Sequence, residues 1–206
     1  MNKISGISRS PLRRLRDIPF LLPVNERDKI NPSRGFFMIA CMDTFYKDMS
    51  AAAACILFSD WSDKDITGQF AGLIGEVKPY EPGRFYKREL PCLLHVLDKI
   101  VEPIDIILID GYVWLDGKKS PGLGAYLYET LGKSTPVIGV GKSRFKDSEF
   151  AQKVYRGKSK SPLYITSVGI DPVIASGYIR RMHGDYRLPT MLRKVDQLCR
   201  LYYDSH

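Results

Sequence analysis

The sequence predicts an α/β fold with one mixed sheet, in which an antiparallel meander is extended by parallel strands and flanked by helices. Three observations predict this class. Strand-like apolar runs separated by short polar turns fill the first part of the chain, an amphipathic helical pattern follows them, and the remaining short apolar runs alternate with helical patterns. Of the 206 residues, 44% are apolar, which is enough to bury one core without a second globular domain.

The first elements are an arm and a meander. Residues 1–33 are rich in Pro, Arg and Asn, and we expect them to form an arm that packs on a single domain at 34–206. Strand-like runs follow at about 36–43, 51–58 and 66–78. Because the connections between them are short and polar, these strands are predicted to pair antiparallel in sequence order.

Helices and strands alternate in the rest of the chain. The spacing of leucines predicts an amphipathic helix over 85–101, with Pro91 in its first turn, and the apolar run 104–109 is predicted to be a central strand. The elements that follow are predicted to be a helix at 122–131, strands at 136–140 and 162–168, and helices at 171–181 and 189–203. This order is that of a ribonuclease-H-like sheet, in which the strands ending at residues 43 and 110 lie side by side.

The charge of the chain favours a polyanionic partner. Thirty-one Lys and Arg against 23 Asp and Glu give a net charge of +8, which favours nucleic acid over an anionic membrane surface. Part of the excess lies at 142–160, which is either a solvated basic face or a surface that binds nucleic acid.

Cysteine spacing and hydropathy indicate the compartment. The four cysteines form no C-x-x-C pair and are expected to be buried free thiols rather than zinc ligands or disulfides. The longest apolar run, at 51–58, is far shorter than the roughly 18 residues of a membrane span, and arginines interrupt the N-terminus. We therefore expect a cytoplasmic protein with no membrane partner.

Acidic residues stand at positions suited to a divalent metal. Two apolar strands end in Asp43 and Asp110, where carboxylates are fixed by the sheet yet accessible to a cation such as Mg²⁺. Glu89 opens the predicted helix after a Pro-Gly turn and is a third candidate, although the helix dipole alone also favours an acidic residue there. Asp196 lies between apolar positions of the last predicted helix, where a lone carboxylate is more typical of an ordinary surface residue than of a metal ligand.

Lys142 follows a buried strand in the sequence Gly139-Val140-Gly141-Lys142-Ser143. The sequence does not complete a P-loop, because Pro136 occupies the position of its first glycine, so no nucleotide cofactor is expected. Lys142 is placed either to contact a scissile phosphate or to be an ordinary surface lysine.

No G-x-S-x-G elbow occurs, which argues against a serine hydrolase.

Tyr80 lies in the stiff turn Pro79-Tyr80-Glu81-Pro82-Gly83. Prolines on both sides limit how far its ring retreats when nucleic acid approaches, so Tyr80 is a candidate wedge that stacks against a base gap.

Taken together, the short motifs of this chain resemble those of the endonuclease V family, in the family's order. The matching motifs are Met42-Asp43-Thr44-Phe45-Tyr46, Pro79-Tyr80-Glu81-Pro82-Gly83, Arg88-Glu89-Leu90-Pro91, Ile109-Asp110-Gly111, Pro136-Val137-Ile138-Gly139-Val140-Gly141-Lys142-Ser143, and Gly184-Asp185-Tyr186-Arg187-Leu188-Pro189 ahead of Asp196. They span about residues 36 to 200.

The resemblance implies a Mg²⁺-dependent endonuclease, with Mn²⁺ able to substitute, that turns hypoxanthine out of the stack and hydrolyses the second phosphodiester bond on the 3′ side of inosine. It implies DNA, RNA or both as substrate, in DNA repair or inosine-RNA processing, and we expect a monomer. The implied metal ligands are Asp43, Glu89, Asp110 and Asp196, and the implied catalytic residues are Asp43, Glu89, Asp110 and Lys142. The implied nucleic-acid-binding residues are Tyr80, Gly83, Gly111, Leu123, Gly124, Lys142 and Arg144.

One departure from the family pattern leaves an alternative open. After Asp110-Gly111 the family usually has His-Gly, whereas this chain has Tyr112-Val113, which bears on the base pocket. The alternative is a catalytically weak or differently selective ribonuclease-H-like protein that binds branched or mismatched DNA.

Overall fold

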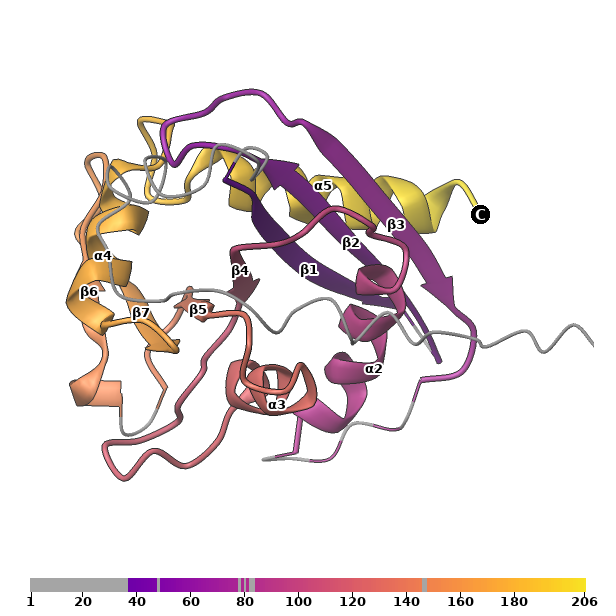
Figure 1. Ribbon diagram of the computed structural model, residues 1–206, viewed down its shortest axis with the longest axis horizontal. Coiled ribbons are helices and arrows are strands. Elements are labelled where there is room, and N and C mark those ends of the chain that lie inside the picture. The colour runs from indigo at the N-terminus through magenta and orange to yellow at the C-terminus, as the bar shows by residue number, and fades with distance from the viewer. Residues whose placement is uncertain (1–36, 48, 78, 80, 82–83, 146–147) are drawn as a thin grey trace, which may run out of the picture. The chain divides into compact units, whose positions relative to one another are not determined.

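The structure, a computed structural model, describes residues 37–47, 49–77, 79, 81, 84–145 and 148–206. The predicted arm at 1–33 lies outside these residues. Among them, seven strands form one sheet in the order β3-β2-β1-β4-β5-β7-β6 (Figure 1). The strands are β1 (Ile39–Lys47), β2 (Ser50–Phe58), β3 (Gly68–Ile74), β4 (Ile106–Asp110), β5 (Val137–Gly141), β6 (Gln152–Val154) and β7 (Leu163–Val168).

Strand pairing confirms the predicted mixed sheet. β1, β2 and β3 form an antiparallel meander, β4 and β5 add to β1 in parallel, and β7 and β6 close the other edge antiparallel. Six of the strands were predicted, with ends shifted by a few residues. The sequence did not predict β6, because three residues are too few to give an alternating pattern.

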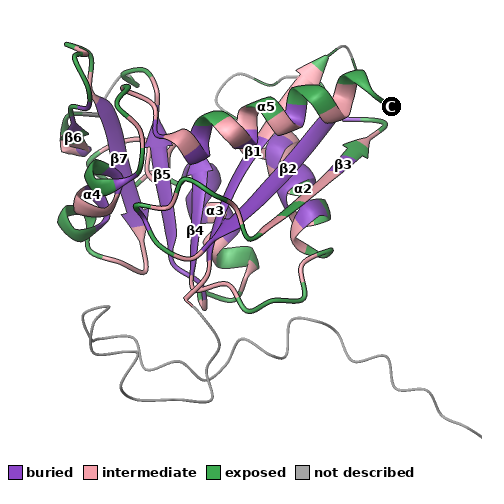
Figure 2. Cartoon of the chain, turned by 90° about the horizontal axis from the view of Figure 1, so that it is seen from above, coloured by how far each residue is buried: buried purple, intermediate pink, exposed green. Residues whose placement is uncertain are grey.

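Helices cover both faces of the sheet. α2 (Tyr86–Leu97) and α3 (Leu123–Thr130) pack on one face, and α4 (Pro172–Arg181) and α5 (Thr190–Asp204) pack on the other. The buried residues, purple in Figure 2, lie mainly along the strands and on the inner sides of these helices. None of the described helices has the length and apolar character needed to cross a membrane.

The prediction that Pro91 lies in the first turn of α2 was wrong. The helix begins at Tyr86, so Pro91 lies inside it rather than in the first turn, and the missing N–H removes one helical hydrogen bond. The helix ends at Leu97 instead of continuing to 101, because the backbone after it tightens into a turn in which Lys99 N–H donates to Val96 O.

Arg156, which belongs to the basic segment 142–160, is buried and structural. Only 6% of the residue is exposed, and its guanidinium donates to four carbonyl oxygens at the end of α4 and in the loop beyond it. The acceptors are Ile179 O (2.7 Å), Arg180 O (3.0 Å), Met182 O (2.7 Å) and Gly184 O (2.7 Å). A cation here satisfies carbonyls that the helix leaves without donors.

Arg156→Met is expected to lower the free energy of unfolding by about 3 kcal/mol or more, because buried carbonyls lose charged donors that water cannot replace. Lys153→Met, at an exposed position of β6 three residues before Arg156, is the control and is expected to change the free energy of unfolding by less than about 0.5 kcal/mol. Chemical denaturation of the two variants measures this difference, and equal stabilities would contradict the structural role.

Candidate functional site

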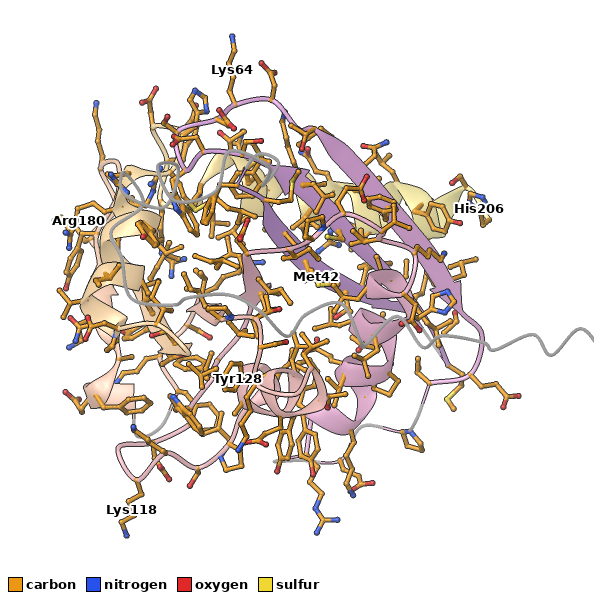
Figure 3. The ribbon with its side chains drawn as sticks, in the orientation of Figure 1. Met42, Lys64, Lys118, Tyr128, Arg180 and His206 are labelled. Carbon is orange, nitrogen blue, oxygen red and sulfur yellow. The ribbon has the colours of Figure 1, made fainter. Side chains whose placement is uncertain are left out.

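Asp43 and Asp110 lie next to each other on the adjacent central strands β1 and β4. Asp110 ends β4 as predicted, whereas the prediction that its neighbour strand ends at Asp43 was wrong, because β1 continues to Lys47 in its pairing with β2. Met42 pairs with Ile109 across the parallel strands β1 and β4, so the two aspartates occupy the next position on each strand. Side chains alternate between faces along a strand, and Cys41 and Leu108 both belong to the core on the α5 side, which places both carboxylates on that face. Met42, labelled near the centre of Figure 3, marks this part of the sheet.

Glu89 approaches the same place from the opposite face. It lies in the first turn of α2, which packs on the other side of the sheet, and it is only 7% exposed. Thr44 joins the two carboxylates: its hydroxyl donates to Glu89 Oε1 at 2.8 Å, and its backbone N–H donates to Asp43 Oδ1 at 2.8 Å. No sequence pattern singles out Thr44 beyond its place directly after Asp43.

Burial of these carboxylates makes their ionised forms costly. Burial, with a further contribution from the charge of Asp110, raises the pKa of Asp43 to about 7 against the opposing effects of Lys142 and the Thr44 N–H. Burial also raises the pKa of Glu89 to about 8, although the Thr44 hydroxyl opposes this. The pKa of Asp110 is raised by burial too, with Lys142 acting in the opposite direction. Full ionisation of the cluster would therefore create more negative charge than its protein neighbours balance.

Lys142 is the cation of this cluster. It follows β5, which lies beside β4 with Val140 opposite Asp110, and its Nζ is 2.6 Å from Asp110 Oδ2. Desolvation would lower the pKa of Lys142, but Asp110, with smaller contributions from Asp43 and Asp196, holds it above its ordinary value. Lys142 is therefore charged at neutral pH and only partly exposed.

Asp196, from α5, joins the cluster more loosely. Its charge contributes to the raised pKa values of Asp43 and Asp110, which places it in their electrostatic neighbourhood. Its carboxylate is paired with Arg200 at 3.1 Å. Across the described part of the chain, no three His, Cys, Asp or Glu side chains are arranged closely enough to hold a metal ion as they stand.

The donors nevertheless fit a hard divalent cation. All four acidic candidates offer carboxylate oxygens, which Mg²⁺ and Mn²⁺ prefer, and histidine and cysteine contribute none. Burial raises the pKa values of Asp43 and Glu89 by more than the nearby charges of Lys142 and Arg88 lower them, and a divalent ion would favour the ionised carboxylates further.

The predicted nucleic-acid-binding residues differ in how accessible they are. Gly111 has φ +129° and open space where a side chain would be, so the backbone beside Asp110 is approachable. Leu123 and Gly124 are buried at the start of α3, and a Cβ on Gly124 would lie 2.6 Å from Val113 Cγ2, which gives this glycine a packing role. Arg144 forms an ion pair with Glu149. Tyr80 and Gly83 lie outside the described residues.

Two relatives named endonuclease V are similar to this chain in sequence. Endonuclease V from Streptomyces avermitilis is 30% identical over 198 residues, covering 84% of this chain and 83% of the relative, and endonuclease V from Trichormus variabilis is 33% identical over 140 residues, covering 58% and 62%.

Solved structures show the same fold. The catalytic domain of human endonuclease V superimposes with a TM-score of 0.70 at 18% identity, covering 94% of this chain and 93% of that one. Endonuclease V of Ciona intestinalis, in complex with a 24mer DNA containing an inosine followed by a ribo-adenosine, gives 0.69 at 15% identity, with 82% and 87% covered. The predicted ribonuclease-H-like fold is thereby confirmed. Since the family model described as endonuclease V matches residues 23–197, this chain belongs to the endonuclease V family, which consists of nuclease hydrolases.

Proposed function

We propose that this protein is a Mg²⁺-dependent endonuclease that recognises inosine or deoxyinosine in nucleic acid and hydrolyses the second phosphodiester bond 3′ to it. Mn²⁺ is proposed to substitute for Mg²⁺. The observation that carries the proposal is the buried carboxylate cluster beside Lys142, because carboxylates with raised pKa values next to a lysine suit binding of a metal and a phosphate together. The inosine-containing DNA in the Ciona complex supports the choice of substrate.

The proposed roles follow from the positions of the side chains. Asp43, Glu89 and Asp110 hold the metal, and Asp196 completes the acidic set from α5. A bound divalent ion supplies charge stabilisation at a non-bridging phosphate oxygen and lowers the pKa of coordinated water. Thr44 fixes the orientation of two of these carboxylates through its backbone N–H and its hydroxyl.

Lys142 is proposed to act on the phosphate. Its ammonium group donates to Asp110 in the free protein, and a phosphodiester offers it a second anionic acceptor at the same edge of the sheet. The open backbone at Gly111 lies beside this edge, and we propose that it faces the flipped base, with Tyr80 as the wedge. We further propose that the protein acts as a monomer in the cytoplasm, in DNA repair or inosine-RNA processing.

Cleavage of defined oligonucleotides tests the proposal. End-labelled DNA and RNA strands with one inosine, and matched strands with adenosine, are incubated with the purified protein and Mg²⁺, Mn²⁺, Ca²⁺ or EDTA. We expect inosine-dependent cutting with Mg²⁺ or Mn²⁺, and a product one nucleotide longer than a cut at the first 3′ bond. Lys142→Ala is expected to lower the rate by about 100-fold or more, whereas Lys118→Ala, at an exposed lysine, leaves it unchanged.

A second candidate function is favoured by one observation. Asp110 and Asp196 are already paired with Lys142 and Arg200, which suits a protein that binds nucleic acid with weak catalysis or with selectivity for branched or mismatched DNA. Flap and mismatch substrates in the same assay separate the two functions. Tight, salt-sensitive binding without a product, or equal cutting of adenosine and inosine strands, would favour the second candidate and overturn the first.

A further inference from the structure

The loop after β5 determines where Lys142 lies. Lys142 is the first residue beyond the strand, and the next residues, Ser143 to Phe145, are exposed. A lysine side chain has many rotamers, so its Nζ keeps one position beside Asp110 only when the backbone that carries it is fixed. Side chains from two other segments of the chain hold this backbone.

Tyr112 holds the loop from the side of β4. Its hydroxyl donates to Ser143 O at 2.8 Å and accepts from the Phe145 N–H at 3.3 Å. Its ring lies directly over Gly141, where an added Cβ would be 2.6 Å from the ring carbon Cζ. Tyr112 stands two residues after Asp110, so one short segment carries both the carboxylate and the side chain that fixes the loop of its lysine partner.

Arg187 holds the same loop from the α4–α5 connection. Its guanidinium donates to Lys142 O, to Ser161 O at 3.0 Å and to Pro162 O at 2.9 Å. The planar fork of arginine suits several carbonyl acceptors at once, which a lysine ammonium does not reproduce. The connection that carries Arg187 is itself anchored, because Arg156 donates to Gly184 O within it.

We propose that Tyr112 and Arg187 are positioning residues that together clamp the backbone of Lys142 and thereby hold Nζ in place for the reaction. The proposal rests on the proposed function for its catalytic part, whereas the clamp itself is a property of the free protein. Neither side chain needs to touch substrate. Because a displacement of about 1 Å of a catalytic group costs up to about 100-fold in rate, loosening the loop is expected to lower kcat without weakening binding.

Conservative variants test the clamp in the full chain. Tyr112→Phe keeps the ring over Gly141 and removes both hydrogen bonds, and Arg187→Lys keeps the charge and removes the fork. The matched control is Tyr203→Phe, which also removes two hydrogen bonds, to Ser50 Oγ and Lys47 O, at another part of the molecule. We expect kcat on the inosine strand to fall by about 10- to 100-fold in the first two variants, with KM and the Kd for the strand within twofold, and no change in the control.

A second background separates positioning from general structural damage. If both residues act through Lys142, then adding Tyr112→Phe or Arg187→Lys to Lys142→Ala lowers kcat no further, whereas independent structural effects multiply. The positioning role would be overturned if kcat of the double variant fell by the product of the two single losses, or if the single variants raised KM and left kcat unchanged.

Amide hydrogen exchange tests the clamp without any nuclease assay. The Phe145 amide, whose N–H donates to the Tyr112 hydroxyl, is expected to exchange about 10-fold faster in Tyr112→Phe and at the wild-type rate in Tyr203→Phe. Unchanged exchange would overturn the clamp. If the unsubstituted chain cuts no inosine strand, the proposed function fails, and exchange at Phe145 still decides whether the clamp exists.

Discussion

Asp43→Asn and Asp110→Asn are each expected to reduce inosine-dependent cleavage by about 1,000-fold or more, because each removes a proposed metal ligand and several kcal/mol of charge stabilisation with it. Asparagine keeps the shape of the side chain, so the fold is preserved and binding of the inosine strand, which depends on the basic surface, stays within a few-fold. Single-turnover cleavage and filter binding at one salt concentration measure the two effects separately.

The control for this experiment is Asp98→Asn, at an exposed carboxylate just after α2. It removes the same charge from the molecule as a whole, so a general electrostatic effect on substrate binding appears in all three variants. Cleavage by Asp43→Asn at a rate within about tenfold of the unsubstituted chain would contradict the assignment of Asp43 as a ligand.

The second large effect is on stability. In the metal-free protein the free energy of unfolding is expected to fall as the pH rises from about 4 to about 8. The sign follows from the raised pKa values: about 7 for Asp43 and about 8 for Glu89 in the folded state, both above their ordinary values. Between the ordinary and the raised pKa values, the folded state binds more protons than the unfolded state. The contribution of each group to stability is therefore complete below its ordinary pKa and is lost as the pH rises to its raised pKa. For Asp43 alone the loss is on the order of 4 kcal/mol.

Urea denaturation in EDTA at pH 5 to pH 8.5 measures this loss. The double variant Asp43→Asn, Glu89→Gln serves as the reference, because it retains every other titrating group and removes the two carboxyl groups whose raised pKa values, about 7 and about 8, fall in this pH range. We expect the reference to be the more stable protein at pH 8 and to show a flatter pH profile. A metal-free wild type that becomes more stable between pH 5 and pH 8, relative to the reference, would contradict the burial of these charges.

Addition of Mg²⁺ at pH 8 is expected to restore stability to the unsubstituted chain and not to the double variant. An ion that binds only the folded state stabilises it by RT ln(1 + [ion]/Kd), or about 2.7 kcal/mol at 100 times Kd. The same carboxylates therefore destabilise the free protein and give it its proposed activity, which is the usual relation between buried charge and an active site.

The sequence predicted the acidic pair and the lysine for a topological reason. Asp110 ends β4, Lys142 directly follows β5, and Asp43 lies just past the last residue of β1 that pairs with β4; because β1, β4 and β5 are parallel neighbours, this strand order brings the three together. Glu89 was predictable because a helix that follows a Pro-Gly turn begins near the edge of the sheet.

Other features depend on tertiary packing that no local pattern records. Thr44 bridges two carboxylates only because α2 packs across the end of β1. In the sequence, Tyr112 was notable only as a departure from the family pattern, in a position expected to affect the base pocket. In the structure its hydroxyl donates a hydrogen bond to Ser143 O, in the loop that carries Lys142. Three of the basic residues at 142–160 have partners within the protein, since Lys142 is paired with Asp110, Arg144 is paired with Glu149 and Arg156 is buried against carbonyl oxygens. Charge along a sequence therefore overstates the basic surface that this segment offers to nucleic acid.

The arrangement of the sheet and helices has a consequence for synthesis on the ribosome. The acidic cluster draws Asp43 from the first described strand and Asp196 from the last helix, and Cys199 of that helix donates to the backbone carbonyl of Asp43. Contacts so distant in sequence form late in folding. A chain still being translated therefore lacks the completed acidic cluster until α5 has been synthesised.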